Sequence, residues 1–220
     1  MKHPSFTDPL FRGKRIGLVN TIKEKGIQDP EVLRAVGTVP RHMFIDTALF
    51  ARAYEDTALP IGMKQTISQP YTVARQTELL QVQKGDKILE VGTGSGYQAA
   101  ILCEMGASVH SVERHDDLYQ HARTLLHDLG YRMRSKCGDG TEGWSAYSPY
   151  DSIVVTAGAP VVPEALVRQL KIGGRLVIPV GDAKVQKMLR ITRTGEHDFS
   201  EEEFSDFQFV PLIGKEGWKP

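Results

Sequence analysis

Residues 90–97, E-V-G-T-G-S-G-Y, constrain the fold of this chain more than any other segment. Residues 87–89 before them form an apolar run of strand type, and residues 98–105 after them have the composition of a helix. A glycine-rich turn between a strand and a helix is where α/β proteins bind nucleotide-like cofactors. The segment therefore predicts a parallel sheet with a ligand crevice at the carboxyl end of this strand.

The spacing of the glycines narrows the kind of ligand. It is G-x-G-x-G, whereas a dinucleotide-binding turn needs G-x-G-x-x-G, and position 97 holds tyrosine instead of the third glycine. A phosphate-binding loop would need a lysine after Gly96, and none occurs before the helix. The turn lets a ligand approach the backbone but offers no charge to a di- or triphosphate. We expect a nucleoside cofactor without phosphate, S-adenosylmethionine rather than NAD.

An acidic residue in the next strand supports a ribose-containing ligand. Glu113 ends the apolar run 109–113, about 20 residues after Gly92, where an acid can accept hydrogen bonds from both ribose hydroxyls. Glu113 could instead only cap the helix expected near Asp116, but the glycine turn favours the ribose contact. The G-D-G at 138–140 is either a plain turn or, beside Glu113, a contact for adenine.

The overall composition is that of a globular protein without a strongly charged partner. Of 220 residues, 40% are hydrophobic and 25% charged, and the 27 basic and 27 acidic side chains cancel. This balance argues against nucleic acid and anionic membranes as partners. The first ten residues hold no apolar signal region, no run of 18 apolar residues occurs, and the two cysteines form no C-x-x-C pair. We expect a monomer in the reducing cytoplasm.

From residue 87 onward, strand and helix patterns alternate. The expected strands are 87–92, 107–113, 132–137, 151–156 and 175–180. The expected helices are 97–105, 116–129 and 163–170, the last ended by the glycine pair 173–174. This alternation predicts a doubly wound parallel sheet. Strands 187–193 and 204–212, joined by a polar loop that includes the acidic run 201–203, predict an antiparallel pair at one edge.

Before residue 87 the pattern is mainly helical. Ile16, Val19 and Ile22 recur at three-residue spacing, and Asp29 followed by proline predicts the start of a helix that runs to residue 36. Residues 54–69 lack helical periodicity and contain proline and glycine, so we expect a loop. We expect one domain, 1–220, with a helical extension and substrate loop in 1–84 and a cofactor-binding core in 85–220.

Residues 65–71, Q-T-I-S-Q-P-Y, contain a candidate functional serine. Ser68 precedes a proline and a segment of helical spacing, 73–82, so it could be only a helix N-cap. A helix N-terminus also binds anions, so a cap and a functional hydroxyl are compatible. No metal site is expected, since His115, His121 and His127 are six residues apart and cannot share one helix face.

These motifs together resemble those of the bacterial protein-L-isoaspartate O-methyltransferases, in the S-adenosylmethionine-dependent methyltransferase superfamily. The most specific element is Q-T-I-S-Q-P-Y at 65, placed before E-V-G-T-G-S-G-Y-Q-A-A at 90. The other matching segments are P-R-H-M-F at 40, G-D-G at 138, D-S-I-V-V-T-A at 151, G-G-R-L-V-I-P-V-G at 173 and F-V-P-L-I-G at 209. The resemblance therefore covers nearly the whole chain.

The resemblance implies a seven-stranded methyltransferase sheet and methyl transfer to the free α-carboxyl of L-isoaspartyl residues in damaged proteins and peptides. The ester then closes to a succinimide, which reopens partly to aspartate. Ser68 is implied as the active-site serine, and Val210, Pro211 and Leu212 as the flank of the substrate cleft. The implied cofactor-binding residues are Thr66, Ile67, Ser68, Gly92, Thr93, Gly94, Ser95, Gly96, Tyr97, Gln98, Glu113, Asp139 and Gly140.

Two other functions stay open. The chain could methylate another small molecule, or could bind a nucleoside without catalysis, although the intact Q-T-I-S segment argues against the second. The sequence also departs from the usual family pattern, with Lys64 in place of glycine and with Arg75 and Gln76 in place of apolar residues. Lys64 could steer the substrate carboxylate or simply point to solvent.

Overall fold

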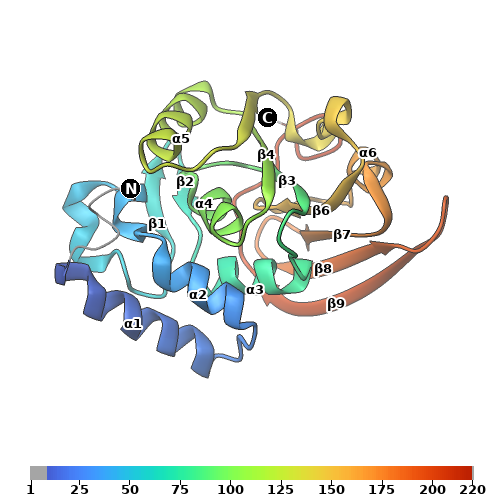
Figure 1. Ribbon diagram of the computed structural model, residues 1–220. Helices are drawn as coiled ribbons and strands as arrows, with labels where there is room; N and C mark the ends of the chain where they lie inside the picture. Colours follow the sequence, from blue (N-terminus) through green and yellow to red (C-terminus); the bar gives the residue numbers. More distant parts are fainter. Residues whose placement is uncertain (1–8, 220) are drawn as a thin grey trace.

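The computed structural model describes residues 9–219, which form a seven-stranded sheet covered by helices (Figure 1). The strands of this sheet are β3 (Lys87–Val91), β4 (Ser108–Glu113), β5 (Arg134–Cys137), β6 (Tyr150–Val155), β7 (Leu170–Gly181), β8 (Gln186–Arg193) and β9 (Phe199–Phe207). Their order is β5-β4-β3-β6-β7-β8-β9, parallel through β7 and antiparallel at β8 and β9. The predicted fold class is confirmed; the predicted domain limits at 1 and 220 lie outside the described residues.

The helices are distributed over both faces of the sheet. They are α1 (Pro9–Glu24), α2 (Pro30–Thr38), α3 (Pro70–Leu80), α4 (Tyr97–Glu104), α5 (Asp116–Asp128) and α6 (Glu164–Arg168). Neighbouring residues of one strand serve different faces: Val154 packs with α2, α3 and α4, whereas Ile153 and Val155 pack in a second cluster with α6. Strands buried on both faces explain the near-continuous apolar runs in the sequence.

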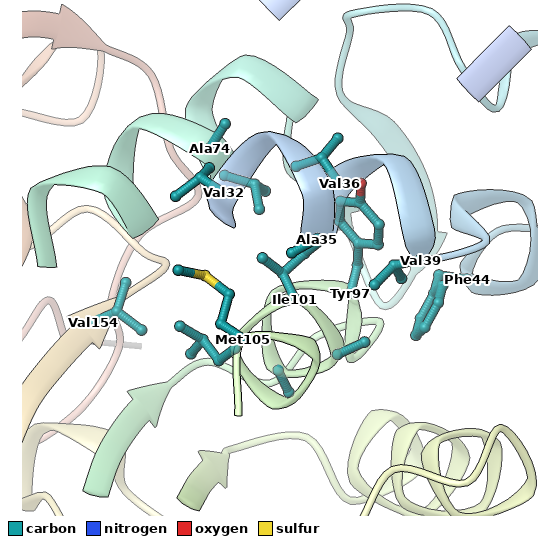
Figure 2. Packing of buried hydrophobic residues seen from close by; sticks show 14 of the residues in the cluster. Val32, Ala35, Val36, Val39, Phe44, Ala74, Tyr97, Ile101, Met105 and Val154 are labelled. Carbon is teal, nitrogen blue, oxygen red and sulfur yellow. The ribbon is translucent and has the colours of Figure 1, made fainter. Parts of the chain in front are cut away.

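The N-terminal helices share their core with the helices that cover the sheet. The α2 residues Val32, Ala35 and Val36 pack against Ile101 and Met105, at α4 and its C-terminal end (Figure 2). The helix α2 begins as predicted, because the Asp29 carboxylate accepts hydrogen bonds from the first two free amides. In α1 the buried face is shifted from the predicted one, since Phe11, Leu18 and Ile22 are buried but Ile16 is 54% exposed.

The predicted loop 54–69 is partly wrong, because it contains a β-hairpin. The strands β1 (Leu59–Gly62) and β2 (Gln65–Ile67) pair antiparallel. Met63 and Lys64 form the turn with positive φ values of 49° and 57°. This left-handed conformation suits a two-residue hairpin turn but is usually reserved for glycine or asparagine, so the sequence carried no hairpin signal.

Two predictions for the C-terminal half are also corrected. The glycine pair 173–174 lies inside β7, at an irregularity of its pairing with β6, and does not separate helix from strand. The acidic run 201–203 belongs to β9 and not to a loop, and β9 ends at Phe207 instead of continuing to Leu212. Glu202 pairs with Arg190 of β8 at 2.7 Å, which lets acidic residues occupy this exposed edge strand.

Candidate active site

The topology itself creates a crevice beside β3. The chain runs from β3 through β4 to β5 on one side, and then places β6 on the other side of β3. Val91 at the end of β3 lies in register with Val112 of β4 and Val155 of β6. The glycine turn therefore follows the strand at which the sheet order reverses, which is where ligands bind in open α/β sheets.

The glycine turn requires glycine for physical reasons. Gly92, Gly94 and Gly96 have φ values of 94°, 52° and 89°, which side chains with a Cβ rarely adopt. A Cβ on Gly92 would also collide with the Oγ1 atom of Thr156, and one on Gly96 would lie 3.0 Å from Leu126. The turn can thus bring its backbone close both to the neighbouring strand and to a ligand.

Glu113 connects the end of β4 to this turn. Its Oε2 accepts a hydrogen bond from the Gly94 amide at 2.8 Å, and its Oε1 accepts from the amides of Arg114 at 2.8 Å and His115 at 2.9 Å. These bonds use three of the roughly four lone-pair positions of a carboxylate, so one on Oε2 stays available. The capping alternative is only partly realised, because the N-cap of α5 is His115.

We predict that Glu113→Ala weakens S-adenosylmethionine binding roughly ten- to a hundredfold, since charge-assisted hydrogen bonds contribute about 1.5–3 kcal/mol. Titration calorimetry measures this, with thermal unfolding to separate the loss of the Gly94 contact. The control is Asp117→Ala, which removes an exposed acid in the first turn of α5. Unchanged affinity in Glu113→Ala would remove Glu113 from the site.

A cavity of about 600 Å³ lies over the glycine turn. Every residue that the sequence and the resemblance placed at a site lines it, except Gly96 and Asp139. The lining residues that the sequence did not predict include Thr156 and His115. Thr156 follows the buried strand β6 directly, so its place at the carboxyl edge of the sheet was a signal that could have identified it.

Asp139, whose neighbour Gly140 lines this cavity, holds two other segments by hydrogen bonds. Its carboxylate accepts hydrogen bonds from the amide and hydroxyl of Thr141 and from the Lys215 amide. Although partial burial raises the pKa of Asp139, these hydrogen bonds lower it below the ordinary value for aspartate. Its neighbour Gly140 does line the cavity, and the adenine contact of Asp139 stays a prediction.

The first two residues of α4 turn their side chains into the protein interior. The Tyr97 ring is buried against Phe44 and lies 4.9 Å from the Arg41 guanidinium, on the α2 side (Figure 2). Gln98 donates a hydrogen bond to the Thr77 hydroxyl of α3 at 2.9 Å. These contacts fix the start of α4, and with it the glycine turn, against the N-terminal layer.

Ser68 lies where two cavities meet. A second cavity, of about 910 Å³, opens beside the first, and the two share Thr66, Ser68, Thr156 and Val210. We call this second cavity the groove. The N-cap of α3 is Gln69, and the Ser68 hydroxyl makes no capping bond. The interpretation of Ser68 as a helix cap is therefore wrong, and Ser68 is one of the residues at the border that the two cavities share, which we call the passage.

Asp56 holds the segment that carries Ser68. Its carboxylate accepts hydrogen bonds from the Tyr71 amide at 2.8 Å and the Gln69 side chain at 3.0 Å, and pairs with Lys25 at 2.5 Å. The Tyr71 amide is thus engaged, and Pro70 has no N–H. A hydroxyl at Ser68, rather than these first amides of α3, is the donor available to an anion in the passage.

The unusual polar residues of α3 find partners in the structure. Gln76 is fully buried and donates a hydrogen bond to the Val155 carbonyl oxygen at 2.8 Å, where β6 ends. Arg75 pairs with Glu78 and lies 5.2 Å from the Phe204 ring. These contacts tie α3 to the sheet, so neither residue points a free charge into the passage.

The left-handed turn at Lys64 leads to a stability prediction. Lys64→Gly should raise the unfolding free energy by about 1 kcal/mol, because glycine adopts this φ without a Cβ clash. Denaturant unfolding measures the gain. The same variant tests steering: a peptide KM that rises only at low salt would support it, and equal KM values would mean that Lys64 points to solvent.

A buried carboxylate beneath the turn predicts a pH dependence. Burial raises the pKa of Glu90 to about 8, although the Ser111 hydroxyl donates a hydrogen bond to it. Folded Glu90 therefore keeps a proton that the unfolded chain loses from about pH 4.5 upward, so stability falls as pH rises to about 8. The unfolding free energy of wild type should fall between pH 5 and pH 8. In Glu90→Gln this fall should be smaller by at least about 1 kcal/mol. Equal losses in denaturant titrations would contradict this.

Within residues 9–219, no cluster of three or more histidine, cysteine, aspartate or glutamate side chains could hold a metal ion. None of the helices described in this range is long and apolar enough to cross a membrane. The residues that line the cavity belong mainly to the glycine turn, the end of β4 with Glu113, the hairpin and the segment 210–213, with the groove beside it.

Comparison with known proteins agrees with this geometry. Residues 14–217 match the family model of protein-L-isoaspartate(D-aspartate) O-methyltransferase. The chain is 58% identical to the protein-L-isoaspartate O-methyltransferase of Salinibacter ruber and 54% identical to that of Cytophaga hutchinsonii, with 95% of each chain covered in both comparisons. A solved structure assigned as this enzyme from Plasmodium falciparum, in complex with S-adenosyl-L-homocysteine, is 25% identical with a TM-score of 0.79, over 90% of this chain and 98% of that one. The chain therefore belongs to the protein-L-isoaspartate(D-aspartate) O-methyltransferase family.

Proposed function

We propose that this protein transfers a methyl group from S-adenosylmethionine to the free α-carboxyl of L-isoaspartyl residues in damaged proteins and peptides. The ester then closes to a succinimide, which opens partly to a normal aspartyl residue. The observation that carries the proposal is the meeting of two cavities at Ser68, one over the glycine turn and one open along the surface. Methyl transfer to a long chain needs this arrangement, because cofactor and peptide must approach one point from different sides.

The residues over the glycine turn fit this cofactor. A cavity of about 600 Å³ suits a ligand of its size. Glu113 keeps an acceptor position toward the cavity for a ribose hydroxyl, and the left-handed glycines allow close backbone approach. When bound, the cofactor supplies an electrophilic methyl group on a positively charged sulfur.

The protein does not need to create the nucleophile. An α-carboxylate has a pKa of about 3.5 and is ionised at neutral pH, so no general base is required. Ser68 would donate a hydrogen bond to one carboxylate oxygen and leave the other free to attack. Thr156 and Val210, which border both cavities, would limit water at the passage. Alignment and removal of water are therefore the contributions of this chain.

The segment 210–212, implied as the flank of the substrate cleft, divides between the two cavities. Val210 lines both, whereas Pro211 and Leu212 line the cavity over the glycine turn. A main-chain hydrogen bond from the Leu212 amide to the Gly158 carbonyl oxygen, at 2.8 Å, fixes this segment beside the residues that follow β6. We propose that Val210 contacts the substrate and that the next two residues close the passage from the cofactor side.

The test is repair itself. An isoaspartyl peptide incubated with the protein and S-adenosylmethionine should convert progressively to the aspartyl peptide, which chromatography separates from the starting material. The reaction without cofactor is the control. Methyl transfer to a small molecule, with none to any isoaspartyl peptide, would favour the alternative function. Cofactor binding without any turnover would favour a nucleoside-binding module.

We further propose that the protein works as a monomer in the cytoplasm, with residues 1–220 as one domain. One chain supplies the glycine turn, Glu113, Ser68 and the segment 210–212, which are all the residues that the proposed reaction uses. Light scattering in the presence of substrate should give the mass of one chain. A stable dimer would overturn this part of the proposal without affecting the assigned reaction.

A further inference from the structure

One wall of the groove is aromatic. Tyr71 and Phe207 stack with ring centroids 6.5 Å apart and an interplanar angle of 18°. Phe209 continues the row, with its ring centroid 6.3 Å from that of Phe207. All three side chains line the groove and are half-buried, so part of each is open to a ligand. We call these three residues the aromatic strip.

Hydrogen bonds and a contact between a lysine and a ring hold the aromatic strip in place. The Phe209 amide donates a hydrogen bond at 2.8 Å to the side chain of Gln186, a residue that is only 2% exposed and that also pairs with Phe207 in the β8–β9 ladder. Tyr71 is fixed by the hydrogen bond of its amide to Asp56 and by Lys25, whose Nζ lies 5.7 Å from the ring centroid. A preformed apolar surface binds without an ordering cost.

The groove is lined by polar as well as apolar side chains, and most of its charged side chains are paired, so the aromatic strip is its main apolar contact surface. Asp56 is neutralised by Lys25, and Asp206 pairs with Lys187 at 2.8 Å. Within the described part of the chain, Lys184 is the charged groove residue without an ion pair. An apolar side chain of a bound peptide that covers the half-exposed rings would therefore be favourable, because apolar surface of both the protein and the peptide is removed from water.

We propose that the aromatic strip selects substrates by the residues that flank the isoaspartyl residue. A large apolar or aromatic side chain within two positions of the isoaspartate packs on the strip while the carboxylate is at Ser68. This inference rests on the proposed function, since it takes the groove as the path of the peptide. Partial burial of a phenylalanine side chain corresponds to roughly a tenfold gain in kcat/KM, expressed through KM.

The experiment uses isoaspartyl hexapeptides in which phenylalanine or serine occupies each of the two positions on either side of the isoaspartate. In wild type, phenylalanine should raise kcat/KM about tenfold over serine at one or more positions. Phe207→Ala should reduce this ratio to below about twofold, through a higher KM for the phenylalanine peptides. The matched control is Phe199→Ala, the same substitution at an exposed position of β9 outside the groove, and it should keep the preference.

The outcomes separate the two proposals. If the wild-type protein methylates all peptides of the series equally well, the selecting role of the strip is overturned while the repair function stands. A preference for phenylalanine that persists in folded Phe207→Ala would also overturn the selecting role of the strip. If that variant does not fold, the comparison of the peptides with the wild-type protein is the test. If no isoaspartyl peptide is methylated, the proposed function itself fails.

Discussion

An isoaspartyl hexapeptide should be methylated by this protein, and the peptide of identical sequence with normal aspartate should not. In the isoaspartyl residue the chain runs through the β-carboxyl, so the free α-carboxylate lies one carbon nearer the backbone. The two carboxylates have the same charge and similar pKa values, so charge cannot distinguish them. Position can, because transfer requires the oxygen about 3–3.5 Å from the methyl carbon and in line with it.

The expected difference in turnover exceeds about 10²-fold, since displacements of about 1 Å already have effects of that order. Binding of the two peptides should differ much less, because the groove contacts the flanking residues in both. Transfer of radiolabelled methyl groups measures turnover, and competition by the aspartyl peptide measures its binding. Comparable rates on both peptides would sink the repair function and promote the small-molecule alternative.

Replacement of Ser68 should have the second largest effect. Ser68→Ala should lower kcat about 10²-fold, because the carboxylate loses the hydrogen bond that orients it in the passage. Cofactor affinity should change little, since Glu113 and the glycine turn are untouched. Stability should stay within about 0.5 kcal/mol, because the Ser68 hydroxyl does not cap α3.

Asp29→Ala provides the opposite pattern as a control. Asp29 does cap a helix, accepting hydrogen bonds from the amides of Glu31 and Val32, so its loss should cost about 1 kcal/mol and lower Tm by roughly 2–4 °C. Its activity well below Tm should be normal. Thermal unfolding and steady-state kinetics on both variants therefore separate capping from catalysis. Full activity in Ser68→Ala would remove this serine from the mechanism.

The parallel part of the sheet could be predicted because each of its strands and turns is recognisable from a short stretch of the sequence. Most of its strands hold a short apolar run, with β5 as the exception, and the turn after β3 has glycines at all three left-handed positions. The position of the crevice also follows from local signals, since Glu113 ends β4 and Thr156 comes directly after β6. Parallel strands meet at one edge of a sheet, so residues distant in sequence could be expected together.

The predictions from sequence were wrong where the structure of a segment depends on the strand or side chain with which it pairs. The turn of the β1–β2 hairpin has methionine and lysine at two positions where glycine or asparagine normally occurs and makes a hairpin recognisable in a sequence. The acidic residues of β9 look like a loop until Arg190 on the neighbouring strand is known. The sequence did not predict the groove for the same reason, because its lining joins Lys25, the segment from Asp56 to Thr72 and residues 205–210, which are distant from one another in sequence.

The ion pair of Lys25 and Asp56, which holds the segment around Ser68 and which we call the clamp, lies in a different part of the chain from the glycine turn and Glu113. The sheet provides the glycine turn and Glu113, whereas the hydroxyl, its clamp and Tyr71 of the aromatic strip all come from residues before 85. Mutation of Asp56, Lys25 or Tyr71, which do not line the cavity over the glycine turn, can therefore alter which acceptor is methylated and leave the cofactor crevice intact. A new acceptor specificity would then be a matter of remodelling one segment and its clamp, with the methyl donor and the sheet inherited unchanged.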